Sequence, residues 1–218
     1  MTNFSGSGKT AWKAFLLWLC LLPLGAVAAE RTASRADFVD LRSHIPGIVV
    51  DTPYATNDNF LKRAVYPRNQ VFLRRSVADR LALVQADLKR AGFGLKVLHG
   101  FRPLSIQREM WKLKPDSRYV ANPARGSRHN RGAAVDVTLV DAAGKELEMP
   151  TEFDDFTSTA HVSARPRNAS AGENRKRLQN AMIRLGFQPL ETEWWHFDAP
   201  DWKEFPITDV TFERLHKR

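Results

Sequence analysis

The spacing of apolar residues predicts two amphipathic helices. In residues 77–91, leucine and valine recur every three or four positions, Ser76 is placed to cap the start, and Gly92 supplies a stop. Residues 172–185 repeat this pattern, and the repeat ends at Gly186. Each predicted helix therefore carries its apolar side chains on one side.

Shorter apolar runs predict strands between these helices. Residues 95–98 form one strand, which leads to Arg102 at its end, and Ser105 is placed to cap a short helix after the proline turn. Residues 133–140 alternate valine and leucine with smaller or polar residues, which is typical of a strand with one face on the core. Asp136 is expected on the face opposite to the valines.

The mixture of helices and strands indicates the fold class. No internal repeat, low-complexity tract or second domain is visible in the sequence. We therefore predict a single α+β domain with a small, mostly antiparallel central sheet that is flanked by helices.

The first 29 residues have the features of a secretory signal peptide. Two lysines precede an apolar run over residues 14–27, and small residues follow it. The run is shorter than the roughly 20 residues that a membrane-spanning helix needs, so we expect no stable membrane anchor. We predict that residues 1–29 are a signal peptide cleaved near Ala29, and that residues 30–218 are exported to the periplasm or beyond.

The composition narrows the chemistry that is available. The only cysteine, Cys20, lies in the leader, so the exported chain has neither disulfides nor thiolate metal ligands. The net charge is +9, but lysine and arginine are scattered among acidic residues and form no basic helix, so we expect no nucleic-acid partner. An exported basic surface suits an anionic cell-wall or membrane setting.

Two histidines and an aspartate have the composition of a catalytic zinc site. His129 lies in a polar turn that leads into the strand of Asp136, and His196 ends the run Glu193-Trp194-Trp195-His196. An unpaired buried carboxylate is costly, and a metal ion is a compensating partner for Asp136. Two imidazoles and one carboxylate leave a fourth position for water, and Glu193 can take a proton from that water. The four other histidines are interpreted as surface or core side chains: His44, His99, His161 and His216.

The position of Glu193 requires an irregular backbone. Residues 194–198 are predicted to form a strand, whose alternation puts His196 and Glu193 on opposite faces. We expect Glu193 to precede the regular strand or to lie at a bulge that turns it back toward the metal.

An ordered set of short motifs resembles the zinc D-alanyl-D-alanine dipeptidase family, which is related to zinc D,D-carboxypeptidases. Ser-x-His-x-x-Gly-x-Ala-x-Asp over residues 127–136 and Glu-Trp-Trp-His over residues 193–196 carry the resemblance. Residues 54–60, residues 100–103 and residues 149–156 resemble further family segments, in the same order. The resemblance thus covers nearly all of the predicted exported chain.

The resemblance implies a role for each matching residue. His129, Asp136 and His196 would hold one Zn²⁺ per chain at one face of the sheet. Glu193 would be the general base, and Arg102 would stabilise negative charge on the scissile carbonyl oxygen.

Three more matching positions belong in or beside the pocket for the free ammonium end of the substrate: Tyr54, Ser127 and Asp154. The sequence also departs from the family at three positions. Pro150 stands where relatives usually have glycine, Asp155 is a second carboxylate beside Asp154, and Phe101 replaces a tyrosine.

The resulting functional prediction is an exported zinc hydrolase that cleaves D-Ala-D-Ala, or small D,D-dipeptides with a free amino end. A carboxylate facing the cleft would pair with the substrate ammonium and exclude an acylated amine, whereas the D-stereochemistry follows only from the resemblance. Two alternatives stay open. One is a zinc D,D-carboxypeptidase or peptidoglycan endopeptidase that acts on longer wall peptides, and the other is a non-catalytic zinc module that binds the wall. The oligomeric state is not legible in the sequence.

Overall fold

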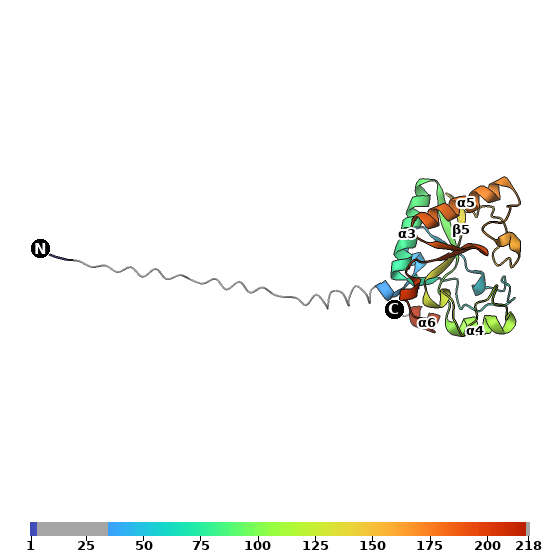
Figure 1. The fold of residues 1–218 in the computed structure, drawn as a ribbon, viewed down its shortest axis with the longest axis horizontal. Coiled ribbons are helices and arrows are strands. Elements are labelled where there is room, and N and C mark those ends of the chain that lie inside the picture. The colour runs from blue at the N-terminus through green and yellow to red at the C-terminus, as the bar shows by residue number, and fades with distance from the viewer. Residues whose placement is uncertain (4–34, 217–218) are drawn as a thin grey trace.

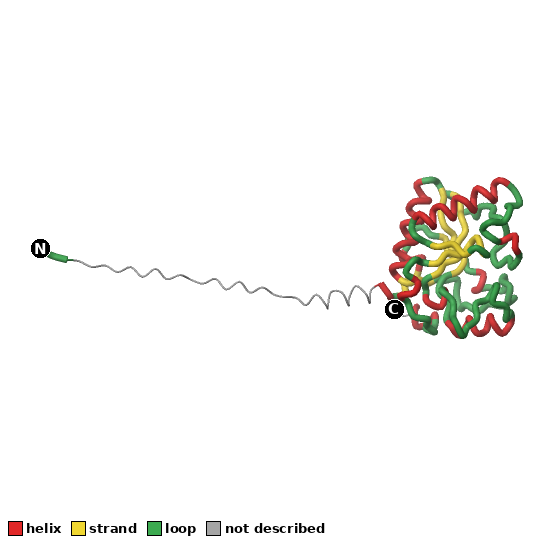
Figure 2. The backbone as a smooth tube through the Cα atoms, viewed as in Figure 1, coloured by secondary structure: helices red, strands yellow, loops and turns green. Residues whose placement is uncertain are grey.

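A five-stranded sheet forms the centre of the protein (Figure 2). The computed structural model describes residues 1–3 and 35–216. The strand order is β2 (Val49–Val50), β4 (Phe93–His99), β5 (Ala134–Asp141), β7 (Glu193–Asp198) and β6 (Gln188–Leu190). Only β2 and β4 pair in parallel, and the other neighbouring strands are antiparallel. The predicted small, mostly antiparallel sheet is therefore confirmed. A separate antiparallel pair joins β1 (Phe38–Asp40) to β3 (Phe72–Arg74).

Helices cover both sides of this sheet (Figure 1). The two long helices, α3 (Arg75–Arg90) and α5 (Ala169–Arg184), contact each other and pack on one side of β5. The shorter helices α4 (Leu104–Leu113) and α6 (Phe212–His216) lie on the other side. One further short helix, α2 (Leu41–His44), follows β1. This arrangement confirms the predicted α+β class.

The main hydrophobic core lies between the long helices and one face of β5. Leu81 of α3, Met182 of α5 and Val137 of β5 are fully buried in it. The apolar positions of the helical repeat and of the strand alternation therefore face the same hydrophobic core, as the sequence pattern predicts. A second, aromatic cluster includes Tyr54, Tyr66, Phe72, Phe101 and Phe212.

The helix starts differ from the sequence prediction. Ser76 was expected to cap α3, but the N-cap is Arg74 and no side chain caps this end. β3 runs directly into α3, and the Arg75 N–H donates to the Asp37 carbonyl at 2.7 Å, so a backbone group replaces the side-chain cap. Similarly, Ser105 lies inside α4, whose N-cap is Pro103.

The helix ends follow the prediction more closely. Gly92 and Gly186 have φ values of 80° and 88°, the left-handed conformation that stops a helix. α5 begins earlier than expected, at Ala169, because Asn168 accepts a hydrogen bond from the Ala171 N–H at 2.8 Å and acts as a cap.

Residues 4–29 of the predicted signal peptide lie outside the described residues, so the leader stays a prediction. In the part of the chain that the structure describes, no helix has both the length and the apolar composition needed to cross a bilayer.

Candidate metal centre and active site

The register of three adjacent strands places His99, Asp136 and His196 in one row. Asp136 of β5 pairs with His99 of β4 on one side and with His196 of β7 on the other. Residues that pair directly across a sheet put their side chains on the same face. Asp136 therefore projects away from the core face of Val135 and Val137, as its place in the alternation predicts.

A tight turn brings His129 to the same row. His129 begins a short 3-10 helix (His129–Arg131) that ends at Gly132, which has a φ of 69°. A Cβ at Gly132 would lie 2.3 Å from the Phe38 ring, so the turn needs glycine for both its conformation and its space. The Arg102 N–H donates to the His129 carbonyl at 3.1 Å, and the Asn130 side chain donates to the Arg102 carbonyl at 2.8 Å. These bonds fix the turn against the end of β4.

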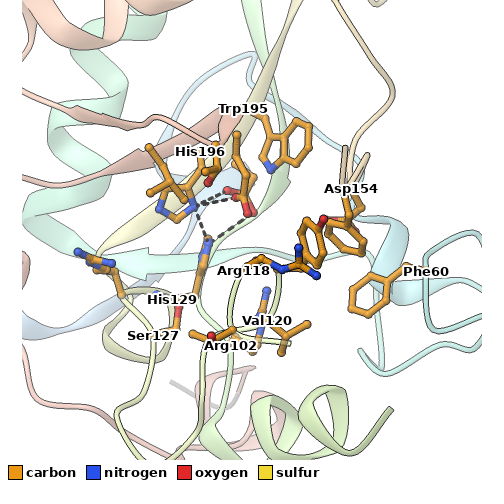
Figure 3. A pocket seen from close by; sticks show the side chains of 18 of the residues that line it. Phe60, Arg102, Arg118, Val120, Ser127, His129, Asp154, Trp195 and His196 are labelled. Carbon is orange, nitrogen blue, oxygen red and sulfur yellow. Dashed lines mark hydrogen bonds and ion pairs between the residues drawn. The ribbon is translucent and has the colours of Figure 1, made fainter. Parts of the chain in front are cut away.

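The three predicted ligands converge with metal-like spacing (Figure 3). His129 Nε2 lies 3.2 Å from His196 Nδ1 and 3.5 Å from Asp136 Oδ2, and His196 Nδ1 lies 3.0 Å from Asp136 Oδ1. Donor atoms bound tetrahedrally to zinc at about 2.0–2.1 Å are separated by about 3.3 Å. The donor set and its spacing therefore fit a zinc ion.

The outer nitrogen of each ligand histidine has its own partner. His129 Nδ1 donates to the Gly100 carbonyl at 2.8 Å, and His196 Nε2 donates to Asp198 Oδ1 at 3.0 Å. Such outer bonds fix the tautomer and ring orientation of metal-binding histidines. Both inner nitrogens are therefore oriented as lone-pair donors toward the shared centre.

Glu193 stands beside this centre at the first residue of β7. Its Oε2 lies 3.8 Å from His196 Nδ1. The pairing of β6 with β7 shifts register between Pro189 and Leu190, where Leu190 pairs with Glu193. The sequence led us to expect such an irregularity, because regular alternation would turn the carboxylate away. Burial raises the pKa of Glu193 to about 7, although the neighbouring His196 opposes the rise.

Arg102 lies behind the metal centre and is almost fully buried. Its Nη1 donates to Gln107 Oε1 at 2.8 Å, while its Nε and Nη2 lie 3.4 and 3.3 Å from the two ring nitrogens of His99. The Gln107 amide in turn donates to the Ala121 carbonyl at 2.7 Å. The guanidinium is thus held in one place by side chains on both sides.

All eight sequence-predicted site residues line one cavity of ≈ 340 Å³: Tyr54, Arg102, Ser127, His129, Asp136, Asp154, Glu193 and His196. At one end the Tyr54 hydroxyl donates to Asp154 Oδ2 at 2.8 Å. Burial raises the pKa of Asp154 to about 8, and the bond from Tyr54 opposes this rise. The structure brings these residues together, whereas their individual roles stay predictions.

The structure separates the two neighbouring carboxylates of this segment. Asp154 has a φ of 60° and faces the cavity. Asp155 instead accepts hydrogen bonds from the Thr157 N–H at 3.0 Å and the Thr159 hydroxyl at 3.3 Å. Of the two, only Asp154 lines the cavity that holds the metal ligands. Phe101 packs into the aromatic cluster, with its ring centroid 4.4 Å from that of Phe38.

Three residues at or near the site were missed by the sequence interpretation: His99, Arg128 and Asp198. His99 is fully buried, as one of the two predicted placements requires, but its contact with Asp136 was not predicted. Asp198 follows His196 by two positions, so strand alternation places it on the ligand face, a signal that was present in the sequence. Arg128 pairs with Asp198 at 3.3 Å and also lines the cavity.

Comparisons with known proteins identify the family of this chain. The chain matches the Peptidase_M15 family, described as D-ala-D-ala dipeptidase, over residues 34–215. The D-alanyl-D-alanine dipeptidase of Escherichia coli (strain K12) is 31% identical over 171 residues, which cover 78% of this chain and 89% of the relative. That of Enterococcus faecalis (strain ATCC 700802 / V583) is 29% identical over 196 residues, covering 80% and 96%.

Among solved structures, the LdcB LD-carboxypeptidase aligns at 22% identity with a TM-score of 0.43, covering 84% of this chain and 78% of that one. The family match spans nearly all of the described fold, including every residue of the cavity named above. The chain therefore belongs to the Peptidase_M15 (D-ala-D-ala dipeptidase) family of metallopeptidases.

Proposed function

We propose that this protein is a zinc-dependent dipeptidase that hydrolyses D-Ala-D-Ala and similar small D,D-dipeptides with a free amino end, using one Zn²⁺ per chain. The observation that carries the proposal is the convergence of His129, Asp136 and His196, with donor atoms 3.0–3.5 Å apart, beside Glu193. The names of the relatives support the substrate, and the donor set supports the metal.

The residues of the site divide the chemistry among them. A zinc ion held by His129, Asp136 and His196 would polarise the peptide carbonyl and lower the pKa of a water molecule. Glu193 takes the proton of the attacking water and passes it to the departing amine. Its position beside the predicted ligands, with Oε2 3.8 Å from His196 Nδ1, suits this proton transfer.

Arg102 supplies charge stabilisation in this scheme. Its guanidinium is permanently charged and presents several donors, which suits a developing oxyanion. Its contacts with Gln107 and His99 hold it in position before substrate arrives. Preorganised donors of this kind need no rearrangement during the reaction, so more of their interaction energy acts on the transition state.

Asp154 and Tyr54 are suited to the ammonium end of the substrate. A carboxylate with a pKa of about 8 gains a charge partner when the substrate ammonium binds. An N-acylated peptide brings no positive charge to this end, so nothing would compensate the ionisation of the desolvated carboxyl group and this interaction would be lost. This contrast favours free dipeptides.

Arg128 is suited to the opposite, carboxylate end. Of the three arginines that line the cavity, Arg102 is engaged by Gln107 and His99, and Arg118 is bound to Asp116 through both Nε and Nη2. Arg128 makes one ion pair among the described residues, through Nε to Asp198 at 3.3 Å, and its guanidinium lies 4.8 Å from the Trp202 ring centroid.

Arg128 and Asp154 line the same cavity, and so does Ser127, which the family resemblance assigns to the ammonium end together with Asp154. A dipeptide zwitterion would thus have an acidic side chain for its ammonium group and a guanidinium for its carboxylate.

One observation favours the second candidate, a peptidase of longer wall peptides. A neighbouring cavity of ≈ 340 Å³ shares Tyr119, Phe156 and Glu193 with the first. A peptide longer than two residues has space to continue there. Export of the chain, inferred from its leader, agrees with either activity, and we propose turnover of wall-derived D-Ala-D-Ala outside the inner membrane.

A single experiment tests these proposals. Zinc content is measured on the purified protein, and hydrolysis of D-Ala-D-Ala and of N-acetyl-D-Ala-D-Ala is followed with and without a chelator. We expect one zinc per chain, cleavage of the free dipeptide, and loss of that cleavage on chelation. Preferential cleavage of the acetylated substrate would replace the dipeptidase proposal by the longer-peptide alternative, and chelator-resistant cleavage would rule out both.

A further inference from the structure

His99 is the most deeply buried titratable group of the site that the proposed mechanism leaves unassigned. It ends β4, directly across from Asp136, and its side chain is 0% exposed. It is not among the residues that line the cavity. A substrate in the cavity therefore has no direct contact with this ring, and any role of His99 acts through its neighbours.

The hydrogen bonds at the two ring nitrogens indicate which nitrogen of His99 carries the proton. His99 Nδ1 lies 2.9 Å from Asp136 Oδ2, and His99 Nε2 lies 2.8 Å from the Tyr66 hydroxyl. An ionised carboxylate only accepts, so Nδ1 carries the proton, and in the neutral ring Nε2 then accepts from Tyr66.

The faces of the ring are also occupied. The His129 ring is stacked on it, with centroids 4.0 Å apart and an interplanar angle of 28°. Arg102 contacts it through two guanidinium nitrogens, at 3.3 and 3.4 Å. One imidazole thus touches two predicted metal ligands, Asp136 and His129, and the predicted oxyanion residue, Arg102.

We propose that His99 is a positioning residue that fixes the orientation of Asp136 and Arg102 together. Its Nδ1–H donates to Asp136 Oδ2 and so fixes the plane of the carboxylate. Oδ1 then faces His196 Nδ1 at 3.0 Å, and Oδ2 lies 3.5 Å from His129 Nε2. The Tyr66 hydroxyl and the Arg102 Nε–H both donate to Nε2 and so support the tautomer that makes this possible. The inference rests on the proposed zinc site, but it concerns only how the chain orients its ligands.

The expected size of the effect follows from this outer position. Removing the hydrogen-bond partner of a metal ligand typically lowers metal affinity by about 10–100-fold. Displacing Arg102 in addition lowers kcat at saturating zinc, whereas KM changes less because His99 does not touch the substrate. A purely structural role would lower the stability of the fold, but it would not lower zinc affinity and kcat while KM stays nearly unchanged.

Two amide variants of the full chain form a matched test. Asparagine places its side-chain nitrogen where His99 has Nδ1, and glutamine places it where His99 has Nε2. His99→Asn keeps a donor for Asp136, whereas His99→Gln does not. The zinc dissociation constant is measured by competition with a chromophoric chelator, and the unfolding midpoint of each metal-free variant is measured by circular dichroism.

We expect His99→Gln to raise the zinc dissociation constant on the order of 10–100-fold and His99→Asn to recover most of that loss, with similar midpoints for the two metal-free variants. Zinc-saturated His99→Gln should show a lower kcat with nearly unchanged KM. Equal zinc affinity in the two variants overturns the proposal.

Tyr66→Phe supplies a test that leaves His99 in place, should either amide variant fail to fold. It removes only the hydroxyl that donates to Nε2. We expect weaker zinc binding than in the wild type, because the Nε2 end of the ring loses its hydroxyl donor and the Nδ1–H is then held less firmly against Asp136, although the carboxylate and the Arg102 Nε–H still favour the same tautomer. Wild-type zinc affinity in this variant overturns the role of Tyr66 and, without folded amide variants, the proposal itself. If the wild type binds no zinc, the proposed function fails instead.

Discussion

The two faces of β5 are equally buried but are built from different interactions. On one face Val135, Val137 and Leu139 are 0% exposed and pack into the main core. On the other face Asp136 is 4% exposed and is surrounded by histidines. Apolar packing is non-directional and scales with buried area, whereas a buried carboxylate depends on the position of each partner.

Within this one strand, the apolar face therefore contributes mainly to the free energy of unfolding, and the polar face is expected to serve metal binding and turnover. The core face holds the strand in place. Its pairing with β7, and a register shift in β4 between Val97 and His99, then bring Asp136 opposite His196 and His99. Substitutions on the apolar side should therefore change the free energy of unfolding, while substitutions on the polar side should change metal binding or turnover.

The largest effect is expected on the polar side, at Glu193. Glu193→Gln keeps the size of the side chain but removes its ability to take a proton, so kcat should fall by about 10²–10⁴-fold while zinc content is retained. Steady-state hydrolysis of D-Ala-D-Ala and metal analysis measure both quantities. Glu191→Gln is the matched control, because Glu191 is exposed and accepts a hydrogen bond from Ser163. Undiminished turnover in Glu193→Gln would show that another group is the base.

The apolar side is tested at Leu81, which is fully buried in α3. Leu81→Ala should lower the free energy of unfolding by about 2–5 kcal/mol, because it leaves a cavity in the core. The zinc affinity of the folded variant should be unchanged. Leu83→Ala, at a position that is 59% exposed, should change stability by less than about 0.5 kcal/mol. Urea unfolding measures both variants, and a large loss of zinc affinity in folded Leu81→Ala would contradict the separation of the two faces.

A smaller effect is expected at the rim of the cavity. Arg128→Gln removes the guanidinium proposed to bind the substrate carboxylate, and a charged hydrogen bond of about 1.5 kcal/mol corresponds to a loss of roughly tenfold in kcat/KM. The loss should appear mainly in KM and should vanish for the amidated dipeptide, which has no carboxylate. Arg108→Gln is the control, since Arg108 pairs with Asp209 and lies outside the lining of this cavity. An equal loss for both substrates would assign Arg128 another role.

A pH dependence of stability is expected at Asp154. Its pKa is raised to about 8 by burial, whereas an unfolded aspartate ionises near pH 4. Between these values the folded, metal-free chain holds a proton that the unfolded chain releases, so stability falls as pH rises from about 4 to about 8. Asp154→Asn should flatten this slope in urea unfolding, and Asp155→Asn should not. Parallel slopes in the wild type and Asp154→Asn would exclude this titration.

Much of this architecture could be predicted because it follows from periodicity. The apolar repeats of α3 and α5 and the alternation along β5 each depend on a single local rule, and the structure places them in one core. The proximity of His129 and Asp136 could be predicted for a similar reason, because the turn of His129 leads directly into the strand of Asp136. Even the irregular backbone at Glu193 was expected from the conflict between strand alternation and chemistry.

The features that escaped prediction depend on contacts between distant segments. His99 meets Asp136 and Tyr66 only through strand pairing and loop packing, and no local pattern distinguishes it from an ordinary core histidine. The uncapped start of α3 depends on Asp37, far earlier in the chain, which accepts from Arg75. Local propensity for a serine cap was overridden by this tertiary contact.

The Phe38 ring that lies against Gly132 has a practical consequence for anyone who handles this protein. The same ring centroid lies 4.1 Å from the Arg74 guanidinium, so the first strand of the described fold packs under the turn that carries the predicted metal ligand His129. An expression design should therefore begin its coding region, or end its purification tag, upstream of residue 35. A truncation that removes the first strand would remove the aromatic side chain against which this turn packs.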